Sequence, residues 1–326
     1  MIATFKKNNP SGKILLFLYA IVLKFPLFFG ANKIQSLSTD GILYKFCGNV
    51  INTIGASFSP IYGLVTFSLL LFQAIYINNI CTQQKLHKQN NYLTGMAYLL
   101  ITSIFPEWFS LSAPLVVNTL IIIAFGKICT LYYDSSPKIN LFNISLIIGI
   151  ASFISFPSIL FLLLAFVGIF IARPFNIKEW LIVFIGITVP LYLFAGYLFI
   201  TDKFYLYKLP KFTFSKINFV HGNTFGVSLF LLVACMAVGM FFINQNFNRQ
   251  VVQTRKSWQL LFFYFIVAAL IPITNANTNF SFWILTAIPV APIIGAAFFY
   301  PTKKWLPLVM HFLLFAIFVF NIFWKK

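Results

Sequence analysis

Residues 180–200 read WLIVFIGITVPLYLFAGYLFI, a run without a single charged side chain. A helix of this length rises about 30 Å, which is the thickness of the hydrocarbon core of a bilayer. Comparable apolar runs follow one another from Ile14 to Trp324, joined by short connectors. The chain is 60% apolar and 9% charged, and its mean hydropathy is +0.90. This pattern predicts an all-α, polytopic membrane protein that forms a single integral-membrane domain over residues 1–326.

The apolar runs also predict how often the chain crosses the membrane. At roughly 16 to 22 apolar residues per crossing, about eleven transmembrane helices are expected. They are predicted at residues 14–30, 59–80, 93–108, 111–130, 140–155, 157–172, 180–200, 224–243, 258–274, 282–299 and 305–323. Tryptophan prefers the headgroup layer, and each tryptophan falls at or next to an end of one of these segments. The first segment lacks a small-x-small cleavage site, so we expect a retained helix rather than a signal peptide.

The distribution of basic residues predicts the orientation in the membrane. The chain has 23 Lys+Arg against 5 Asp+Glu, but these charges lie in short connectors, which indicates membrane topology rather than nucleic-acid binding. With a cytoplasmic N-terminus, every arginine and half of the lysines fall in inside connectors, and fewer basic residues fall outside. We therefore expect a multi-pass protein of the bacterial inner membrane with its N-terminus in the cytoplasm. Dispersed cysteines and histidines predict neither a disulfide framework nor a metal site.

Two segments do not read as simple crossings. Residues 41–57 are mixed in polarity, which favours an interfacial helix on the outer membrane face. Residues 201–222 form the longest outside loop and alternate aromatic with basic side chains. This loop is either an interfacial belt with snorkelling lysines or a contact for a phosphate or lipid headgroup. Its lysines are Lys203, Lys208, Lys211 and Lys216.

The acidic residues are few enough to consider one by one. Two of them, Asp40 and Glu107, are predicted to face the same outer surface although they are far apart in the sequence. A carboxylate at the edge of a membrane is either a functional acid or a headgroup-level acid paired with a lysine such as Lys33 or Lys45. The remaining acids are expected to be solvated loop charges, namely Asp134, Glu179 and Asp202.

The order of short motifs resembles that of the integral-membrane glycosyltransferases of the C superfamily, which use lipid-linked sugars. That superfamily includes the dolichyl-phosphate-mannose protein mannosyltransferases and the aminoarabinose transferases of lipid A. The similar stretches are Asp-Gly-Ile-Leu-Tyr at 40–44, Phe-Pro-Glu at 105–107, SAPLVVN at 112–118, the Gly-rich span and hairpin at 149–158, and FWILTAIPVAP at 282–292. The chain departs from the family where Gly41 takes the place of the usual second acid.

The resemblance implies an activity and roles for individual residues. It implies transfer of a sugar from a polyprenyl-phosphate carrier to an acceptor on the non-cytoplasmic face. Asp40 would be the general base or the ligand of a divalent cation, and Glu107 would position the acceptor. Substrate binding would fall to Tyr44, Lys203, Lys208, Lys211, Lys216 and His221.

A second resemblance leaves the function open. Residues 172–180, Ala-Arg-Pro-Phe-Asn-Ile-Lys-Glu-Trp, are similar to an inside connector in an uncharacterised bacterial membrane-protein family. The alternative to a transferase is therefore a non-enzymatic membrane subunit or a transporter of unknown ligand. Transport favours internal repeats and polar groups in mid-membrane, and the predicted spans hold only neutral polar groups there. The expected partners are membrane lipid and a polyprenyl-phosphate sugar, while protein partners and cofactors stay undefined.

Overall fold

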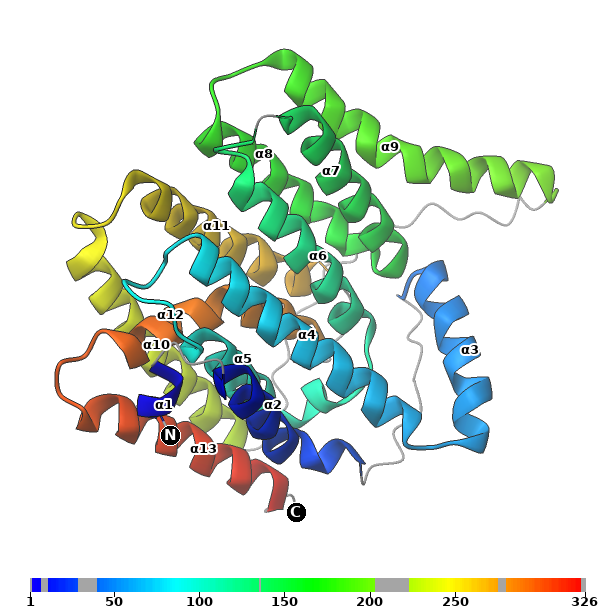
Figure 1. Cartoon of the computed structure of the whole chain (residues 1–326). Helices are drawn as coiled ribbons and strands as arrows, with labels where there is room; N and C mark the ends of the chain where they lie inside the picture. Colours follow the sequence, from blue (N-terminus) through cyan, green and yellow to red (C-terminus); the bar gives the residue numbers. More distant parts are fainter. Residues whose placement is uncertain are drawn as a thin grey trace.

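The computed structural model describes residues 2–6, 11–28, 40–134, 136–202, 223–274 and 280–323, and in this part of the chain all regular structure is helical (Figure 1). The elements in order are α1 (Ile2–Lys6), α2 (Ser11–Lys24), η1 (Phe25–Phe28), α3 (Ile42–Ser57), α4 (Ile61–Gln83), α5 (Leu93–Ile104), η2 (Pro106–Phe109), α6 (Ala113–Thr130), α7 (Pro137–Ile154), η3 (Phe156–Phe161), α8 (Leu162–Ala172), α9 (Ile177–Ile200), α10 (Asn223–Phe247), α11 (Val252–Ile273), η5 (Phe280–Thr286), α12 (Ala287–Phe299) and α13 (Trp305–Phe323). The all-α prediction is confirmed.

Eight helical segments of the described chain are long and apolar enough to cross a membrane. They are α4, α6, α7, α9, α10, α11, the η5–α12 segment and α13, while α5 and the η3–α8 segment are apolar but shorter. Each segment predicted from the sequence overlaps one of these helices or, for the first, α2. The prediction of a multi-pass membrane protein is therefore confirmed at this level.

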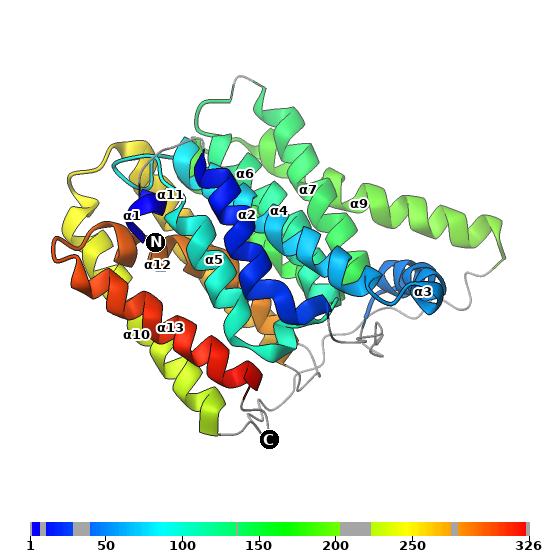
Figure 2. The ribbon, with the colours of Figure 1, turned by 60° about the horizontal axis from the view of Figure 1, so that its bottom comes forward.

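A pair of helices fills the centre of the bundle. Every residue of α5 and every residue of α12 is buried, and the two helices pack directly on each other. Helices α2, α4, α10 and α13 surround the pair (Figures 1 and 2). Helix α10 approaches α12 closely because Gly239 faces the Ile293 carbonyl, where a β-carbon would overlap the oxygen. The short helix α5 is thus enclosed by protein rather than exposed to lipid.

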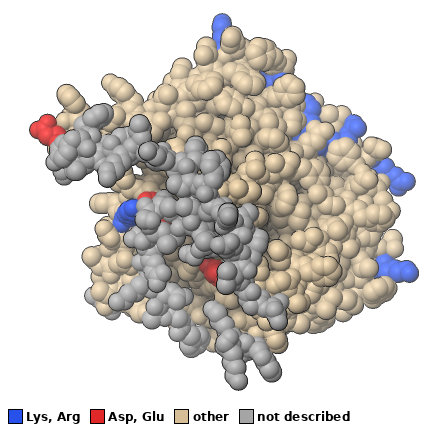
Figure 3. Space-filling view, turned by 180° about the vertical axis from the view of Figure 1, so that it is seen from behind, with Lys and Arg blue, Asp and Glu red and all other residues tan. Residues whose placement is uncertain are grey.

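From α4 onward the successive α-helices, the short α5 and α8 included, run in alternating directions, so the connectors gather at two ends of the bundle (Figure 1). We call one the basic end, because it carries the exposed side chains of Lys85, Lys88, Lys178, Lys303 and Lys304. The other, which we call the Asp40 end, holds residues 40–41, 105–112 and 155. Seen from behind, most of the visible basic side chains lie along one margin of the molecule (Figure 3).

Helix α9 stands apart from the central bundle and packs chiefly along α7. Small residues bring the two helices together: a β-carbon on Gly149 would lie 3.0 Å from Cγ of Pro190, and one on Gly186 would overlap the Ser145 hydroxyl. The last ring contact is between Phe194 and Phe153, with centroids 5.1 Å apart. Beyond it α9 projects past α7 and is widely exposed (Figure 1).

Two further expectations concern the segment at residues 41–57 and the hairpin at residues 149–158. Residues 41–57, expected to be an interfacial helix, do form a helix, α3, which presents Phe46, Val50 and Ile54 outward. Its placement in the membrane interface stays a prediction. The turn of the predicted hairpin between α7 and α8 is covered by neighbouring helices, since Pro157 and Ser158 are buried.

Candidate functional site at the Asp40 end

Asp40 lies at the start of α3 and is only 6% exposed. Its position is set by the next residue, because the Gly41 amide donates a hydrogen bond of 2.9 Å to the Ile154 carbonyl at the end of α7. A β-carbon on Gly41 would overlap the Phe153 carbonyl oxygen, so no larger residue fits at this contact. The contact between residue 41 and the end of α7 therefore sets where the chain enters α3.

Tyr44 joins Asp40 to the segment that carries the second acid. Its hydroxyl donates a hydrogen bond of 2.9 Å to the Leu111 carbonyl, and its side chain is 4% exposed. Burial, and next the negative charge of Asp40, raise the pKa of the Tyr44 phenol. Tyr44 is therefore a neutral hydrogen-bond donor that lies within electrostatic reach of Asp40.

Glu107 is half-buried in η2, which begins at Pro106. The following residue fixes this short helix: the Trp108 indole N–H donates to the Phe280 carbonyl at 3.2 Å, and the two rings stack with centroids 5.5 Å apart. Phe105 and Phe225 complete an aromatic cluster around Phe280. Asp40 and Glu107 thus lie at the same end of the bundle, while a cavity shared by both stays a prediction.

Sequence reasoning missed three further polar side chains at this end. Ser155 and Ser158 are almost fully buried in the turn next to Ile154, and neither hydroxyl oxygen has a hydrogen-bond partner among the described residues. Lys24, at the end of α2, is completely buried; its ammonium donates to the Thr102 hydroxyl at 3.1 Å and lies 4.6 Å from the centroid of the Phe109 ring. In the sequence these residues look like the exposed serines and lysines that are common at the ends of spans. Only the packing of the helices shows that they are buried.

The remaining substrate-binding candidates cannot be placed. Lys203, Lys208, Lys211, Lys216 and His221 all lie outside the described residues. Nor do the described residues bring together any group of three or more His, Cys, Asp or Glu side chains that could hold a metal ion. Asp40 is an oxygen donor of the kind that Mg²⁺ prefers, but this donor set is incomplete, and no step proposed below passes through a metal.

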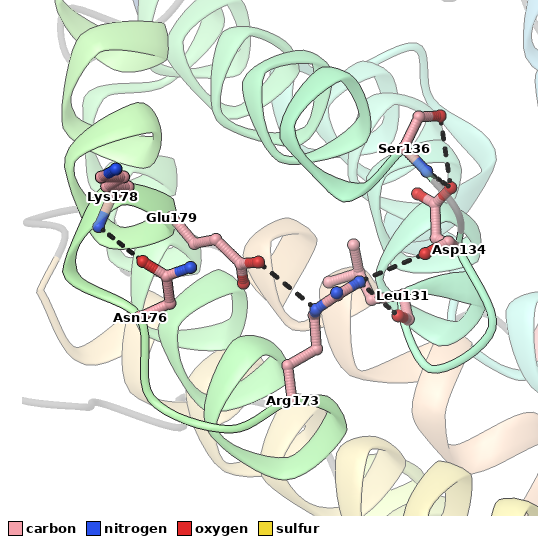
Figure 4. A network of polar contacts seen from close by, with 7 residues as sticks. All are labelled: Leu131, Asp134, Ser136, Arg173, Asn176, Lys178 and Glu179. Atoms are coloured by element: carbon pink, nitrogen blue, oxygen red, sulfur yellow. Dashed lines mark hydrogen bonds and ion pairs between the residues drawn. The ribbon is translucent and has the colours of Figure 1, made fainter.

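The prediction for Glu179 is wrong. We expected a solvated loop charge, but Glu179 is 5% exposed and pairs with Arg173, with Oε1 and Nε 3.4 Å apart (Figure 4). The Arg173 guanidinium also donates to the Asp134 carbonyl at 3.3 Å. This network holds the ends of α6 and α8 against the start of α9 at the basic end.

The two other expected loop charges differ from Glu179. Asp202 is exposed after the end of α9, as expected for a loop charge. Asp134 is half-buried and accepts hydrogen bonds from the Asn140 amide at 2.6 Å and from the Ser136 amide at 2.9 Å (Figure 4). Burial opposes its ionisation, but these hydrogen bonds, aided by Arg173, lower the pKa of Asp134 overall.

The motif at residues 172–180 has a structural explanation at the basic end. Asn176 caps α9, since its side chain accepts a hydrogen bond from the Lys178 amide at 3.1 Å (Figure 4). The Trp180 ring stacks on Phe166 of α8 with centroids 5.0 Å apart. A small pocket lined by Cys129, Lys256 and other residues of α6, α8 and α11 also lies at the basic end, away from Asp40. These features position helices and contribute nothing to the Asp40 end.

No family model, no curated protein and no solved structure matches this chain. The site therefore has to be interpreted from its own geometry.

Proposed function

We propose that this chain is a membrane glycosyltransferase that moves a sugar from a polyprenyl-phosphate carrier to an acceptor on the non-cytoplasmic face. The observation that supports the proposal most is the buried carboxylate of Asp40 at one end of an apolar helical bundle, beside the phenol of Tyr44. Burying a carboxylate is costly, and such groups at a membrane edge are functional candidates. The eleven-span topology and the arrangement of the C-superfamily transferases belong to this proposal.

In the proposed reaction Asp40 is the general base. The acceptor hydroxyl gives its proton to the Asp40 carboxylate as its oxygen attacks the anomeric carbon. The bond from that carbon to the carrier phosphate breaks, and the phosphate leaves with the electron pair. Glu107 positions the acceptor, and lysines of the 201–222 loop stabilise the negative charge of the leaving phosphate.

The test compares Asp40→Asn with two matched variants. Membranes that contain the protein are supplied with radiolabelled polyprenyl-phosphate sugars, and the release of the free carrier is measured. We expect Asp40→Asn to lower the rate by about 10² to 10⁴, because that is the usual effect of removing a general base. Asp40→Glu should retain part of the activity, and Asp202→Asn, which removes an exposed acid at the end of α9, should retain all of it.

The alternative of a non-enzymatic subunit makes the opposite prediction. If the wild type releases no carrier from any polyprenyl-phosphate sugar, and Asp40→Asn fully complements a deletion strain, the transferase proposal is wrong. Asp40 would then be a structural charge at the start of α3.

A further inference from the structure

Three polar side chains lie on one face of the central helix α5. Thr94, Tyr98 and Thr102 follow one another at intervals of four residues, which places them in a row along the helix. All three are fully buried, in a helix of which every residue is buried. At its 12 residues, α5 is about 18 Å long, shorter than the hydrocarbon core of a bilayer. The row therefore runs through the middle of the bundle from one end of α5 to the other.

Neighbouring helices extend this row with further polar groups. The Tyr98 hydroxyl donates to the Gln73 carbonyl oxygen of α4, and the Asn118 amide of α6 lies 3.5 Å from both. At the Asp40 end the row continues through Thr102 to the ammonium of Lys24. We call the set of His87, Thr94, Tyr98, Thr102, Gln73, Asn118, Tyr264 and Lys24 the α5 column.

At the basic end the column reaches His87. Gly295 of α12 makes the approach possible, since its missing side chain leaves space between the Thr94 hydroxyl and the His87 ring. A β-carbon there would lie 3.1 Å from Thr94 Oγ1 and 3.4 Å from His87 Cε1. The column thus has an ionisable side chain at each end and neutral hydrogen-bonding groups between them.

Several atoms of the column lack a hydrogen-bond partner among the described residues. They are Oγ1 of Thr94, Oδ1 of Asn118, the hydroxyl of Tyr264 and Nε2 of His87, all in side chains no more than 6% exposed. The Tyr264 phenol on α11 is fully buried and lies within electrostatic range of the Tyr98 phenol. Buried polar atoms are nearly always paired, and ordered water supplies the partner where protein does not.

We propose that the α5 column is a hydrated proton pathway through the bundle between His87 and Lys24. Hydroxyl, imidazole and water each accept one proton and release another, and the Lys24 ammonium releases its proton before it takes up the next, so the column is unchanged after a proton has crossed. Ionisable groups within membrane-spanning bundles commonly serve as proton relays. The proposal does not depend on the transferase activity, because the column runs through the core whereas Asp40 lies at its margin.

The first test measures proton flux in liposomes that contain the purified protein. A potassium gradient with valinomycin sets the potential, and an internal pH-sensitive dye reports entry of protons. We expect the wild type to exceed empty liposomes, and Tyr98→Phe to reduce the protein-dependent flux at least tenfold. Tyr19→Phe is the matched control, since Tyr19 is equally buried and hydrogen-bonded, but to His311 outside the column. A wild-type flux equal to that of empty liposomes overturns the proposal, as does an unchanged flux in Tyr98→Phe.

The second test detects water directly in the wild-type protein, so its result does not depend on whether a variant folds. Hydroxyl radicals generated by an X-ray pulse label buried residues where ordered water touches them. We expect fast labelling of Tyr264, and slow labelling of Phe125 and Phe161, whose rings pack on Tyr264 with centroids 5.1 and 5.5 Å away and which are fully buried. Equal, slow labelling of all three side chains means a dry column and refutes the pathway.

Discussion

Gly41 packs so closely against the carbonyl of Phe153 that a β-carbon on residue 41 would overlap its oxygen. The same glycine donates its amide hydrogen to the Ile154 carbonyl. The end of α7 therefore fixes the position of the start of α3 and of Asp40 beside it.

This contact predicts that Gly41→Ala is damaging. The added methyl group must push α3 away from α7, so both the thermal stability and the proposed transferase activity should fall. Gly226→Ala is the matched control, since a β-carbon there meets no atom within 4 Å. In helix α10 that change should be neutral or stabilising by about 0.5 to 1 kcal/mol. Melting of both variants in detergent checks the prediction, and equal midpoints would contradict it.

The Arg173–Glu179 pair predicts a measurable coupling energy. Glu179 is buried, so removing Arg173 alone leaves a poorly compensated charge, whereas removing both partners does not. A double-mutant cycle of Arg173→Gln and Glu179→Gln should give a coupling of about 1 to 3 kcal/mol in equilibrium unfolding. A coupling near zero would mean that the pair behaves like an exposed surface bridge.

Lys24 predicts an unusual response to an apolar substitution. Its ammonium is fully buried against Thr102 and Phe109, and burying a charged group lowers the free energy of unfolding. Lys24→Met should therefore keep or raise the melting temperature while it stops flux through the α5 column. Lys13→Met, at an exposed position in the same helix, should change neither. A large loss of stability in Lys24→Met would show that the charge itself holds α2 in place.

His87 predicts a loss of stability at acidic pH. Burial lowers the pKa of its imidazole from 6.5 to about 4, opposed by a hydrogen bond to the Pro292 backbone. Between these values the unfolded chain binds more protons than the folded one, so stability falls as the pH drops from about 6.5 towards 4. Thermal melts across this range should show a decline that is smaller in His87→Gln. Parallel declines in both proteins would assign the effect to other groups.

The topology can be tested without any assumption about activity. Reporter fusions after Asn90, at the basic end, and after Asp202, beyond α9, should report opposite sides, with Asn90 in the cytoplasm. This follows from the excess of basic residues in the connectors of the basic end. Two fusions on the same side would refute the predicted crossing pattern between them.

The helices could be predicted well from the sequence, because a long apolar run by itself indicates a membrane-spanning helix. The irregular segment at 41–57 was also predicted as a helix, and α3 covers almost the same residues. The burial of Glu179 was missed, because its partner Arg173 looked like one more basic residue of a connector. The α5 column was missed for a different reason: Gln73, Tyr98 and Asn118 lie on three separate helices, and each is unremarkable within its own run.

The candidate site was predictable only in part. Asp40 and Glu107 were placed at one end by counting crossings, whereas Tyr44 was named only because residues 40–44 resemble a family motif. Nothing in the sequence indicated that Ser155 and Ser158 would be buried in the same region, since serines in a turn are normally exposed. Their position depends on how α7 and α8 pack, which is a property of the assembled bundle.

The exposed end of helix α9 makes its orientation depend on the membrane. It packs on α7 through Gly149 and Gly186, and past Phe194 it makes few contacts with the other residues that the structure describes. Phe199 and Ile200 are 74% and 81% exposed. In a membrane, lipid acyl chains rather than protein side chains must surround these turns. When the hydrophobic length of the helix and the thickness of the bilayer differ, tilting the least restrained helix has the lowest free-energy cost. The angle between α9 and α7 should therefore follow the length of the lipid tails, while the central pair α5 and α12 keeps its geometry.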